Sequence, residues 1–457
     1  MLRLISIWLF ASLVGGHLSL AAETSREPLL KPSPCQPVSL PRRETPSPAN
    51  RMSIQGDRYE ALSQIALGWG KTGVPLVGFD GQNLMAAGCG DDIGIYFVIP
   101  MLAKVARIPI GDAIDLFLVG TVLVSGLLGT FGLMLVCRHG FGRIVAICAV
   151  ALVCLLSLKT GDVYVVQSSA VLAFAPWVLF FGMRALSLWS TLPFVFFVSA
   201  ALASANLMRS HSGTPVLIFM AWIFIFQLQG ERKLKLLLTL AAIAGLLLPI
   251  SYSRLVVQAR NTYLQKQAYG STTGTPHHVF WHVIYVGLGF LSNDVVPGYR
   301  DEIAAAKVRE MAPQAIYTSP EYEEYLKREV IHIVAHHPLL VMETLAAKLG
   351  VIVGWLLLCT NLGLVAAYHY PKYWAVEVAF WNAIAFQALA GIVAIPAKAY
   401  LLGFIAFAVL YGIISIDAAL QRSTVQECSW LIRSRWGSTR GGSVQASLIV
   451  PIHRGER

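Results

Sequence analysis

Residues 113–137 read AIDLFLVGTVLVSGLLGTFGLMLVC, and Asp115 is the only charged residue among them. A helix rises about 1.5 Å per residue, so roughly 20 apolar residues suffice to cross the hydrocarbon of a membrane, which is about 30 Å thick. This stretch therefore predicts a transmembrane helix. Further apolar stretches on both sides of it along the chain predict an integral membrane protein.

The composition of the whole chain agrees with this prediction. Of its 457 residues, 56% are hydrophobic and 13% are charged, whereas soluble domains average about 25% charged residues. A soluble enzyme, a disordered protein and a disulfide scaffold all fit poorly. In a soluble chain the net charge of +10 would suggest a nucleic-acid partner. Here most basic residues lie in short loops between apolar segments, so we expect no nucleic-acid partner.

Ten segments are long and apolar enough, or nearly so, to be membrane spans. The first follows Arg3 and ends at Ala21-Ala22, so a cleaved signal peptide is the alternative to a retained span. We favour the retained span. The approximate bounds are 4–22, 113–137, 142–158, 164–183, 190–207, 214–229, 236–256, 350–368, 374–395 and 399–417.

The basic residues of the loops predict the orientation, because they favour the cytoplasmic side. With a cytoplasmic N-terminus, the short outer loops contain only Lys159, Arg209 and Lys398. Both termini are then cytoplasmic, and the two long polar segments lie together on the outer side. The inner segments contain Arg3, Arg138, Arg143, Arg184, Arg232, Lys233, Lys235, Lys372 and six arginines of the tail.

The predicted fold class is an all-α integral membrane protein. It has about ten transmembrane helices and two large extracytoplasmic segments that carry interfacial helices. In chain order the parts are a first transmembrane helix or signal anchor (1–22), an extracytoplasmic loop with a proline-rich linker and interfacial helices (23–112), transmembrane helices two to seven (113–256), a second extracytoplasmic segment (257–349), transmembrane helices eight to ten (350–417) and a basic cytoplasmic tail (418–457).

Two helices are predicted in the first outer loop. Residues 56–75, GDRYEALSQIALGWGKTGVP, have apolar side chains at helical spacing over 58–69, and Asp57 precedes them where a capping carboxylate is common. Asp91 and Asp92 precede IGIYFVIPMLAKVARI, which predicts a helix lying along the membrane surface. Cys35 and Cys89 fall in the same loop and would be able to pair in an oxidising compartment.

These motifs resemble the start of glycosyltransferases of the C superfamily, which use lipid-phosphate-linked sugars. The closest type is the protein mannosyltransferase or aminoarabinose transferase. The resemblance covers roughly 56–260. It rests on GD-x-Y at 56–59, Trp69, Gly73, MLAKVARI at 101–108 and AIDLF at 113–117. It implies a polyprenyl-phosphate-linked sugar as donor and membrane lipids as partners. A strict DxD motif is absent, so the metal requirement is unknown and a divalent metal ion is only a possible cofactor.

The resemblance also implies candidate catalytic residues. Asp57 corresponds to the acidic residue of the family's first loop, the candidate base. Asp162 in KTGDVYVVQSSA is the candidate for a second carboxylate, although Gln167 occupies the position where an acid fits the helix better. Asp162 or Asp91 would contact a metal ion or the acceptor, and Asp92 is a further candidate for substrate binding.

Arg209 is the candidate phosphate ligand. It lies in NLMRSHSGTP, just after the fifth span, with Ser210, His211 and Ser212 beside it. A guanidinium is well suited to hold a phosphate in bidentate fashion, and His211 would add a second donor. The alternative is an arginine that only extends its charge to the lipid headgroups.

The second outer segment is rich in histidine. His278 and His282 are four residues apart, a spacing that places both rings on one helix face. Metal binding, contact with phosphate or sugar, and simple packing all remain open. Asp301, near Tyr299, lines the acceptor entrance or belongs to a turn. A helix is predicted from Ser319 to Pro338, and a further interfacial helix over 338–349.

The predicted function is an inverting glycosyltransferase. It would move a sugar from a polyprenyl-phosphate donor to a lipid, glycan or protein acceptor on the outer face of a bacterial-type inner membrane. The alternatives are a flippase or other transporter of lipid-linked sugars, and a polysaccharide polymerase or ligase. Transporters usually place polar groups at the membrane midplane, whereas here the polar residues gather at one face.

Overall fold

The computed structural model describes residues 56–87, 92–183, 188–226, 232–267, 279–315, 317 and 319–437, and the side chains of 56, 57 and 424–437 lie outside this description. The elements are α2 (Gly56–Thr72), β1 (Val77–Phe79), β2 (Leu84–Ala86), α3 (Ile93–Ala106), α4 (Ile110–Val136), α5 (Gly140–Thr160), α6 (Val165–Met183), α7 (Leu188–Met208), α8 (Thr214–Phe226), α9 (Arg232–Lys266), α10 (Phe280–Leu288), α11 (Asp301–Met311), α12 (Pro320–His336), α13 (Pro338–His369), α14 (Trp374–Val393) and α15 (Leu402–Gly437).

Within the described ranges, eight helices are long and apolar enough to cross a membrane: α4, α5, α6, α7, α9, α13, α14 and the first part of α15. Large apolar side chains on these helices, among them Leu127, Phe197 and Leu362, are more than half exposed. Contact with lipid accounts for such exposure. The predicted helical integral membrane protein is therefore confirmed. Helix α8 has 13 described residues and is shorter than the predicted span over 214–229.

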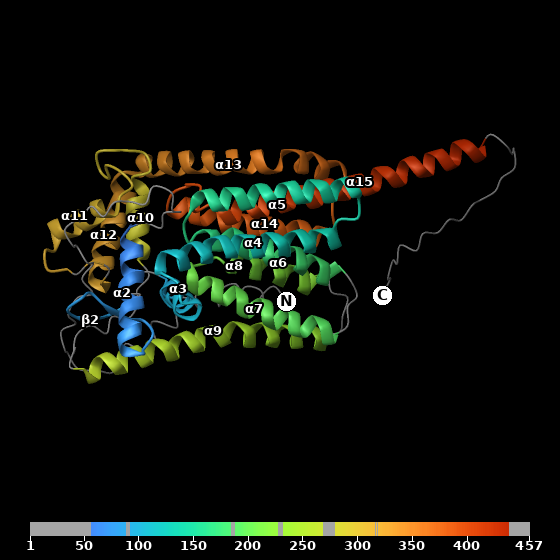
Figure 1. The fold of residues 1–457 in the computed structure, drawn as a ribbon. Coiled ribbons are helices and arrows are strands. Elements are labelled where there is room, and N and C mark those ends of the chain that lie inside the picture. Colours follow the sequence, from blue (N-terminus) through green and yellow to red (C-terminus); the bar gives the residue numbers. More distant parts are fainter. Residues whose placement is uncertain are drawn as a thin grey trace.

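The long helices form one bundle, and the shorter elements gather at one end of it (Figure 1). This end, the cap end, carries α2, α3, the β1–β2 hairpin and α10–α12, at the left of the figure. We call α10–α12 and the chain between them the cap. At the opposite end, α15 extends beyond the other helices. The described parts of the two long polar segments thus share one end of the bundle, although they are far apart in the sequence.

Several helix boundaries differ from the predicted ones. Helices α9 and α15 run past the spans predicted over 236–256 and 399–417, because no glycine or proline interrupts either sequence there. The interfacial helix predicted over 338–349 is wrong as a separate element, since these residues are the first turns of α13. After Pro338 no proline breaks this helix before its end at His369.

Other local predictions are confirmed. The helix expected over 58–69 lies within α2, and the helix expected after Asp92 is α3, whose position along the membrane surface stays a prediction. Helix α12 begins as the sequence predicts, with the Ser319 hydroxyl accepting from Tyr322 N and proline at the first helical position. The β1–β2 hairpin and α11 are not predicted. The carboxylate of Asp80 forms the hairpin turn by accepting from Gln82 N at 2.8 Å and Asn83 N at 2.6 Å.

The cap has a hydrophobic core separate from that of the bundle. Its members come from all three cap helices: Tyr285, Val286, Leu288, Val296, Ala304, Val308, Tyr322, Leu326, Val330 and Ile333. The cap meets the bundle where α10 crosses the end of α14. A Cβ at Gly287 would lie 2.4 Å from the Val393 carbonyl oxygen, so only glycine permits this approach.

A buried lysine completes this junction. Lys348 of α13 is fully buried. Its Nζ donates to the carbonyl oxygens of Ile392 at 2.9 Å and Ala394 at 2.6 Å. These carbonyls belong to the last turn of α14 and have no partner within their own helix. The ammonium group therefore satisfies the end of α14 and joins α13, α14 and the cap.

The opposite end of the bundle is held by two polar clusters. Lys372 Nζ lies 2.7 Å from a carboxylate oxygen of Glu377 and donates to the Ser415 hydroxyl. The Asp417 carboxylate accepts from Arg138 N at 3.2 Å and His139 N at 3.0 Å, where α5 begins. These contacts tie α14, α15 and the α4–α5 loop together.

Packing of α13 on α15 gives a prediction for stability. A Cβ at Gly363 would lie 2.4 Å from the Gly412 Cα, so the substitution Gly363→Ala must push the two helices apart. We expect it to destabilise the fold by about 1–3 kcal/mol and to lower the thermal unfolding temperature in detergent. The control is Gly354→Ala on the same helix, where an added Cβ meets no atom within 4 Å. Equal unfolding temperatures for the two variants would contradict this packing.

Candidate functional site

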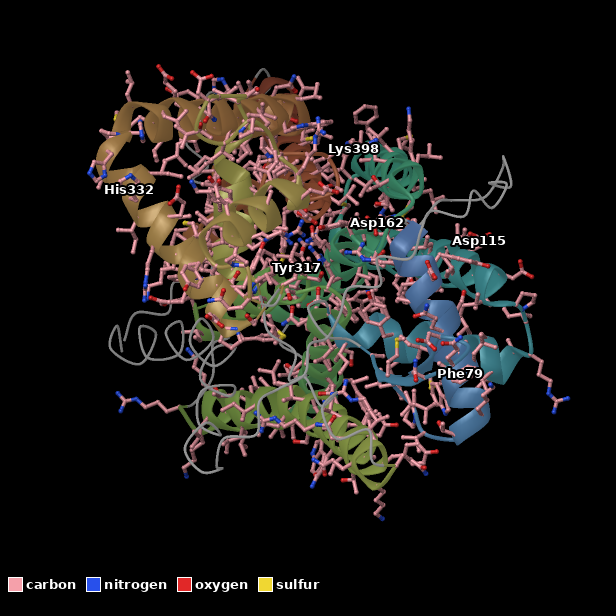
Figure 2. All side chains as sticks on the ribbon, turned by 90° about the vertical axis from the view of Figure 1, so that its left-hand side faces the viewer. Phe79, Asp115, Asp162, Tyr317, His332 and Lys398 are labelled. Atoms are coloured by element: carbon pink, nitrogen blue, oxygen red, sulfur yellow. The ribbon has the colours of Figure 1, made fainter. Side chains whose placement is uncertain are left out.

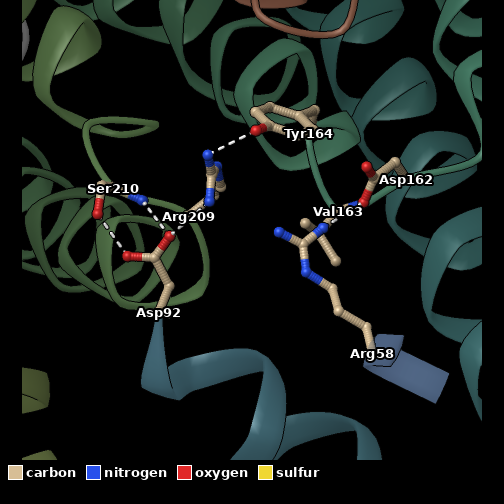
Figure 3. Close-up of polar contacts among 7 residues, drawn as sticks. All are labelled: Arg58, Asp92, Asp162, Val163, Tyr164, Arg209 and Ser210. Atoms are coloured by element: carbon tan, nitrogen blue, oxygen red, sulfur yellow. Dashed lines mark hydrogen bonds and ion pairs between the residues drawn. The ribbon is translucent and has the colours of Figure 1, made fainter. Parts of the chain in front are cut away.

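A buried ion pair joins the first polar segment to the loop between α7 and α8 (Figure 3). Asp92 Oδ2 accepts from Arg209 Nη1 at 3.2 Å and from Ser210 N at 3.0 Å, and Asp92 Oδ1 accepts from the Ser210 hydroxyl. The Asp92 side chain is only 5% exposed. Although Asp92 directly precedes α3, its carboxylate does not cap that helix. It instead fixes the position of Arg209.

A tyrosine holds Arg209 on another side. Arg209 Nη2 donates to the Tyr164 hydroxyl at 2.6 Å, and the guanidinium carbon lies 4.3 Å from the centre of the Tyr164 ring. His211 is less closely integrated. Its backbone is left-handed, with φ of 65°, and its ring lies 6.2 Å from that of Phe386. Arg209 and Ser210 thus both bind Asp92, whereas the ring of His211 packs toward α14.

A second ion pair connects α2 with the loop before α6. Arg58 Nη1 donates to Asp162 Oδ1 at 3.0 Å, and the same oxygen accepts from Val163 N at 2.6 Å (Figure 3). Arg58 directly follows Asp57, so the backbone of one predicted catalytic residue lies next to the ion pair formed by the other. The side chain of Asp57 lies outside the described residues.

Three tyrosines continue the polar contacts from Arg209 to the cap. The rings of Tyr164 and Tyr400 are 4.7 Å apart, and the hydroxyls of Tyr299 and Tyr400 lie 3.0 Å apart. Burial raises the pKa of Tyr164 and of Tyr299 far above the ordinary value. Both phenols therefore remain protonated and are able to donate hydrogen bonds.

His282 is the central polar residue of the cap. Its Nδ1 lies 2.8 Å from the Tyr322 hydroxyl, its Nε2 lies 3.1 Å from Asp301 Oδ1, and its side chain is 4% exposed. A neutral ring that donates from Nε2 and accepts at Nδ1 satisfies both contacts. Glu323 fixes the backbone at His282, because its carboxylate accepts from Trp281 N at 2.7 Å and from His282 N at 3.1 Å.

Asp301 is far more exposed than Asp92 and Asp162, the two carboxylates that arginines bind. Its side chain is 70% exposed, compared with 14% for Asp162. The hydrogen bond from His282 lowers the pKa of Asp301, and the charge of Arg58 lowers it further. Burial raises the pKa of Glu323, against the opposing effect of its backbone donors. Asp301 is therefore ionised at neutral pH and open to the outside.

Three predicted site residues cannot be compared with these contacts. Asp91 and His278 lie outside the described residues, as does the side chain of Asp57. The same holds for the possible pair Cys35–Cys89. In the described part of the chain, no three His, Cys, Asp or Glu side chains are grouped as metal ligands. The possible divalent metal ion therefore stays a prediction.

Sequence reasoning missed several residues of the site. Arg58, Tyr164, Tyr322 and Glu323 contact predicted residues, and Tyr400 contacts Tyr164 and Tyr299. Arg58 and Tyr164 stand within two residues of Asp57 and Asp162, and a search for charged or aromatic neighbours would have found them. Tyr400 carries no local signal, because only the fold brings it to Tyr299. The rings of His332 and His336 on α12 lie 4.1 Å apart, and His332 is on the outer side of the cap (Figure 2).

An apolar cavity of about 240 Å³ adjoins the Asp92–Arg209 pair. It lies among α3, α7 and α9, and its wall includes Ile93 and Met208, which are the chain neighbours of Asp92 and Arg209. The other lining residues are mostly apolar: Leu76, Gly94, Phe97, Val98, Ser204, Leu207, Pro249, Tyr252, Ser253 and Val256. A charged pair and an apolar cavity thus lie next to each other at the cap end.

Comparisons with known proteins give one distant structural likeness. No protein-family model matches the chain, and no curated protein sequence does. A search of solved structures finds the crystal structure of ArnT from Cupriavidus metallidurans in the apo state, with 13% sequence identity, over 79% of this chain and 72% of that one, at a TM-score of 0.32. At this identity and TM-score the likeness does not establish a function.

The contact between His282 and Asp301 predicts how stability depends on pH. The folded-state pKa of Asp301 lies below the ordinary 3.8, so the ionised carboxylate stabilises the fold above that pH. The contribution is lost as the pH falls through the lower folded-state value. We expect Asp301→Asn to lower the thermal unfolding temperature at neutral pH and to have less effect at a pH below the folded-state pKa.

The matched control for this measurement is Glu302→Gln, which removes an exposed charge from the next position of α11. Its effect on the unfolding temperature should be small at both pH values. An unfolding temperature of Asp301→Asn that differs from the wild type equally at both pH values would show that the His282 contact does not stabilise the fold.

Proposed function

We propose that the protein is a membrane glycosyltransferase that moves a sugar from a polyprenyl-phosphate donor to an extracytoplasmic acceptor. The observation that carries this proposal is the position of Arg209, held by Asp92 and Tyr164 beside an apolar cavity. A lipid phosphate needs a cation for its charge and an apolar channel for its chain. Both requirements are met at one place, where the membrane helices end.

In this proposal the phosphate lies near Arg209 and the start of the lipid chain enters the cavity among α3, α7 and α9. Lys398 supplies a further positive charge. It lies in the loop before α15, two residues from Tyr400, and its backbone carbonyl accepts from Leu401 N at 3.2 Å. The phosphate would gain charge-assisted hydrogen bonds from these groups.

The proposed reaction is a displacement at the anomeric carbon. A hydroxyl oxygen of the acceptor attacks C1 of the sugar, the bond from C1 to the phosphate oxygen breaks, and its electron pair stays on the polyprenyl phosphate. Asp57 accepts the proton of the acceptor as general base. Asp162 and Asp91 would position the acceptor or a divalent metal ion, and His211, Asp92, His278, His282 and Asp301 would line the binding site.

The proposal includes an orientation. The cap end faces the outer side of a bacterial-type inner membrane, and both termini lie in the cytoplasm, as the loop charges favour. The polar contacts at the opposite end, around Lys372 and Asp417, tie α5, α14 and α15 together. A transporter must open that end in each cycle, whereas a transferase has no such need.

The role of Asp57 is tested by Asp57→Asn. We expect this variant to insert and express normally but to lose transfer of a radiolabelled sugar from polyprenyl-phosphate donors, because an amide does not accept the proton. A loss of roughly 100-fold or more is expected for a general base. Glu60→Gln, which removes an exposed carboxylate one turn later on α2, should keep full activity. Full activity of Asp57→Asn would refute its role.

The lipid cavity is tested by filling it. Ser204 lines the cavity, so Ser204→Phe should reduce the amount of polyprenyl lipid that co-purifies with the protein in native membranes. Ser204→Ala leaves the space open and serves as the matched control. Mass spectrometry of the extracted lipids measures the difference. Equal amounts of polyprenyl lipid in the two variants would place the lipid chain elsewhere.

A further inference from the structure

The cap presents a carboxylate to which the proposed reaction gives no specific task. Among the described carboxylates around Arg209 and Arg58, Asp92 and Asp162 are bound by arginines and backbone or hydroxyl donors, and Glu323 is bound by two backbone N–H groups. Asp301 is bound through Oδ1 to His282, and its side chain is 70% exposed. Its carboxylate is thus the one most open to a ligand.

The position of Asp301 is fixed although it is exposed. The buried His282 donates to it from one ring nitrogen, and Tyr322 engages the other. Glu323 holds the backbone of His282 at the start of α10. A surface carboxylate that serves only solubility needs no such support. A carboxylate that must bind a ligand at a defined place needs this support, because a fixed rotamer reduces the conformational entropy that the side chain loses on binding.

An aromatic side chain packs against the residues that hold this carboxylate. The Tyr317 ring lies 5.8 Å from that of His282 and 5.2 Å from that of Tyr322. Burial is the main cause that raises the pKa of Tyr317 to about 12 and the pKa of Tyr299 above its ordinary value, and the charge of Asp301 contributes to both shifts. In Figure 2 Tyr317 lies near the middle of the cap end, between Asp162 and His332. Protonated phenols and one ionised carboxylate thus occur together.

The same groups are in electrostatic contact with the cations of the site. Arg58 acts on Asp301, and Arg209 acts on Tyr299. The hydroxyl contact between Tyr299 and Tyr400 and the ring contact between Tyr400 and Tyr164 provide a structural connection to Arg209. Contacts through Tyr164, Tyr400 and Tyr299 thus lead from Arg209 to the residue two positions before Asp301.

We infer that Asp301 is the residue that recognises the sugar of the lipid-linked donor, by accepting hydrogen bonds from its hydroxyl groups, and that His282 is the residue that positions it. The inference rests on the proposed function and adds a separate subsite to it. Hydroxyl donors to an ionised carboxylate form strong, charge-assisted hydrogen bonds. The ligand class is a neutral sugar with free hydroxyls, and the lipid phosphate is bound independently of Asp301.

The test compares binding of a lipid phosphate without a sugar and of the same lipid phosphate with different sugars attached. Full-length protein in lipid nanodiscs is titrated with polyprenyl phosphate and with a panel of polyprenyl-phosphate hexoses and pentoses. We expect the wild type to bind at least one sugar-bearing lipid more tightly than polyprenyl phosphate. Asp301→Asn should weaken binding of that lipid about tenfold or more, the effect of losing a hydrogen bond to a charged group. Binding of polyprenyl phosphate should not change.

Two further variants make the result specific. Glu302→Gln, with the same charge change at the next exposed position, should bind both lipids as the wild type does. His282→Asn should weaken binding of the sugar-bearing lipid but not of polyprenyl phosphate, since it acts only through Asp301. A structural defect of the cap would lower the unfolding temperature without this selectivity between the lipids.

The outcomes separate the inference from the proposed function. If the wild type binds neither lipid, the donor class is wrong and the function proposed above fails together with the inference. If the wild type prefers the sugar-bearing lipid and Asp301→Asn keeps the same preference, the inference fails alone. If Asp301→Asn loses affinity for both lipids equally, Asp301 supports the fold or the phosphate site and does not recognise the sugar.

Discussion

The largely buried pair of Asp92 and Arg209, whose side chains are 5% and 20% exposed, is the interaction on which the arrangement of the cap end depends. Taking two charges out of water is costly, and removing either partner leaves the other uncompensated. The pair joins the start of α3 to the loop between α7 and α8, which are more than 100 positions apart in the sequence. Because Arg209 also engages Tyr164, this one contact sets the relative positions of the surface helix, the bundle and the loop that leads into α6.

Sequence patterns predicted the fold far better than its contacts. Apolar stretches found the membrane helices because lipid demands a long run of apolar residues, and no other constraint imitates that signal. Helix ends were less predictable, because α9 and α15 continue past the apolar segments that predicted them, through polar residues that also favour a helix. Within the site, Asp92, Asp162 and Arg209 were identifiable as charges at the ends of apolar segments. Their partners were not, because Tyr400 reaches Tyr299 only through the fold.

The cap adds a second level of organisation. Its three helices enclose their own apolar core, against which Leu340 and Val341 at the start of α13 also pack. It is joined to the bundle at few places, chiefly where Gly287 meets the end of α14 and where Tyr299 meets Tyr400. A small, self-supporting unit of this kind can differ in its ligand-binding side chains while the membrane helices beneath it stay the same.

Helix α13 has a consequence for how this molecule responds to force. It begins in the cap, directly after α12, and continues for 32 residues without a proline inside it, a length of about 48 Å. A helix that is unbroken over this distance behaves as a stiff rod. A tilt imposed on its outer end by the cap is therefore not absorbed locally, and the inner end, near His369 and Lys372, must shift in turn. The two surfaces of the membrane are mechanically connected through a single element.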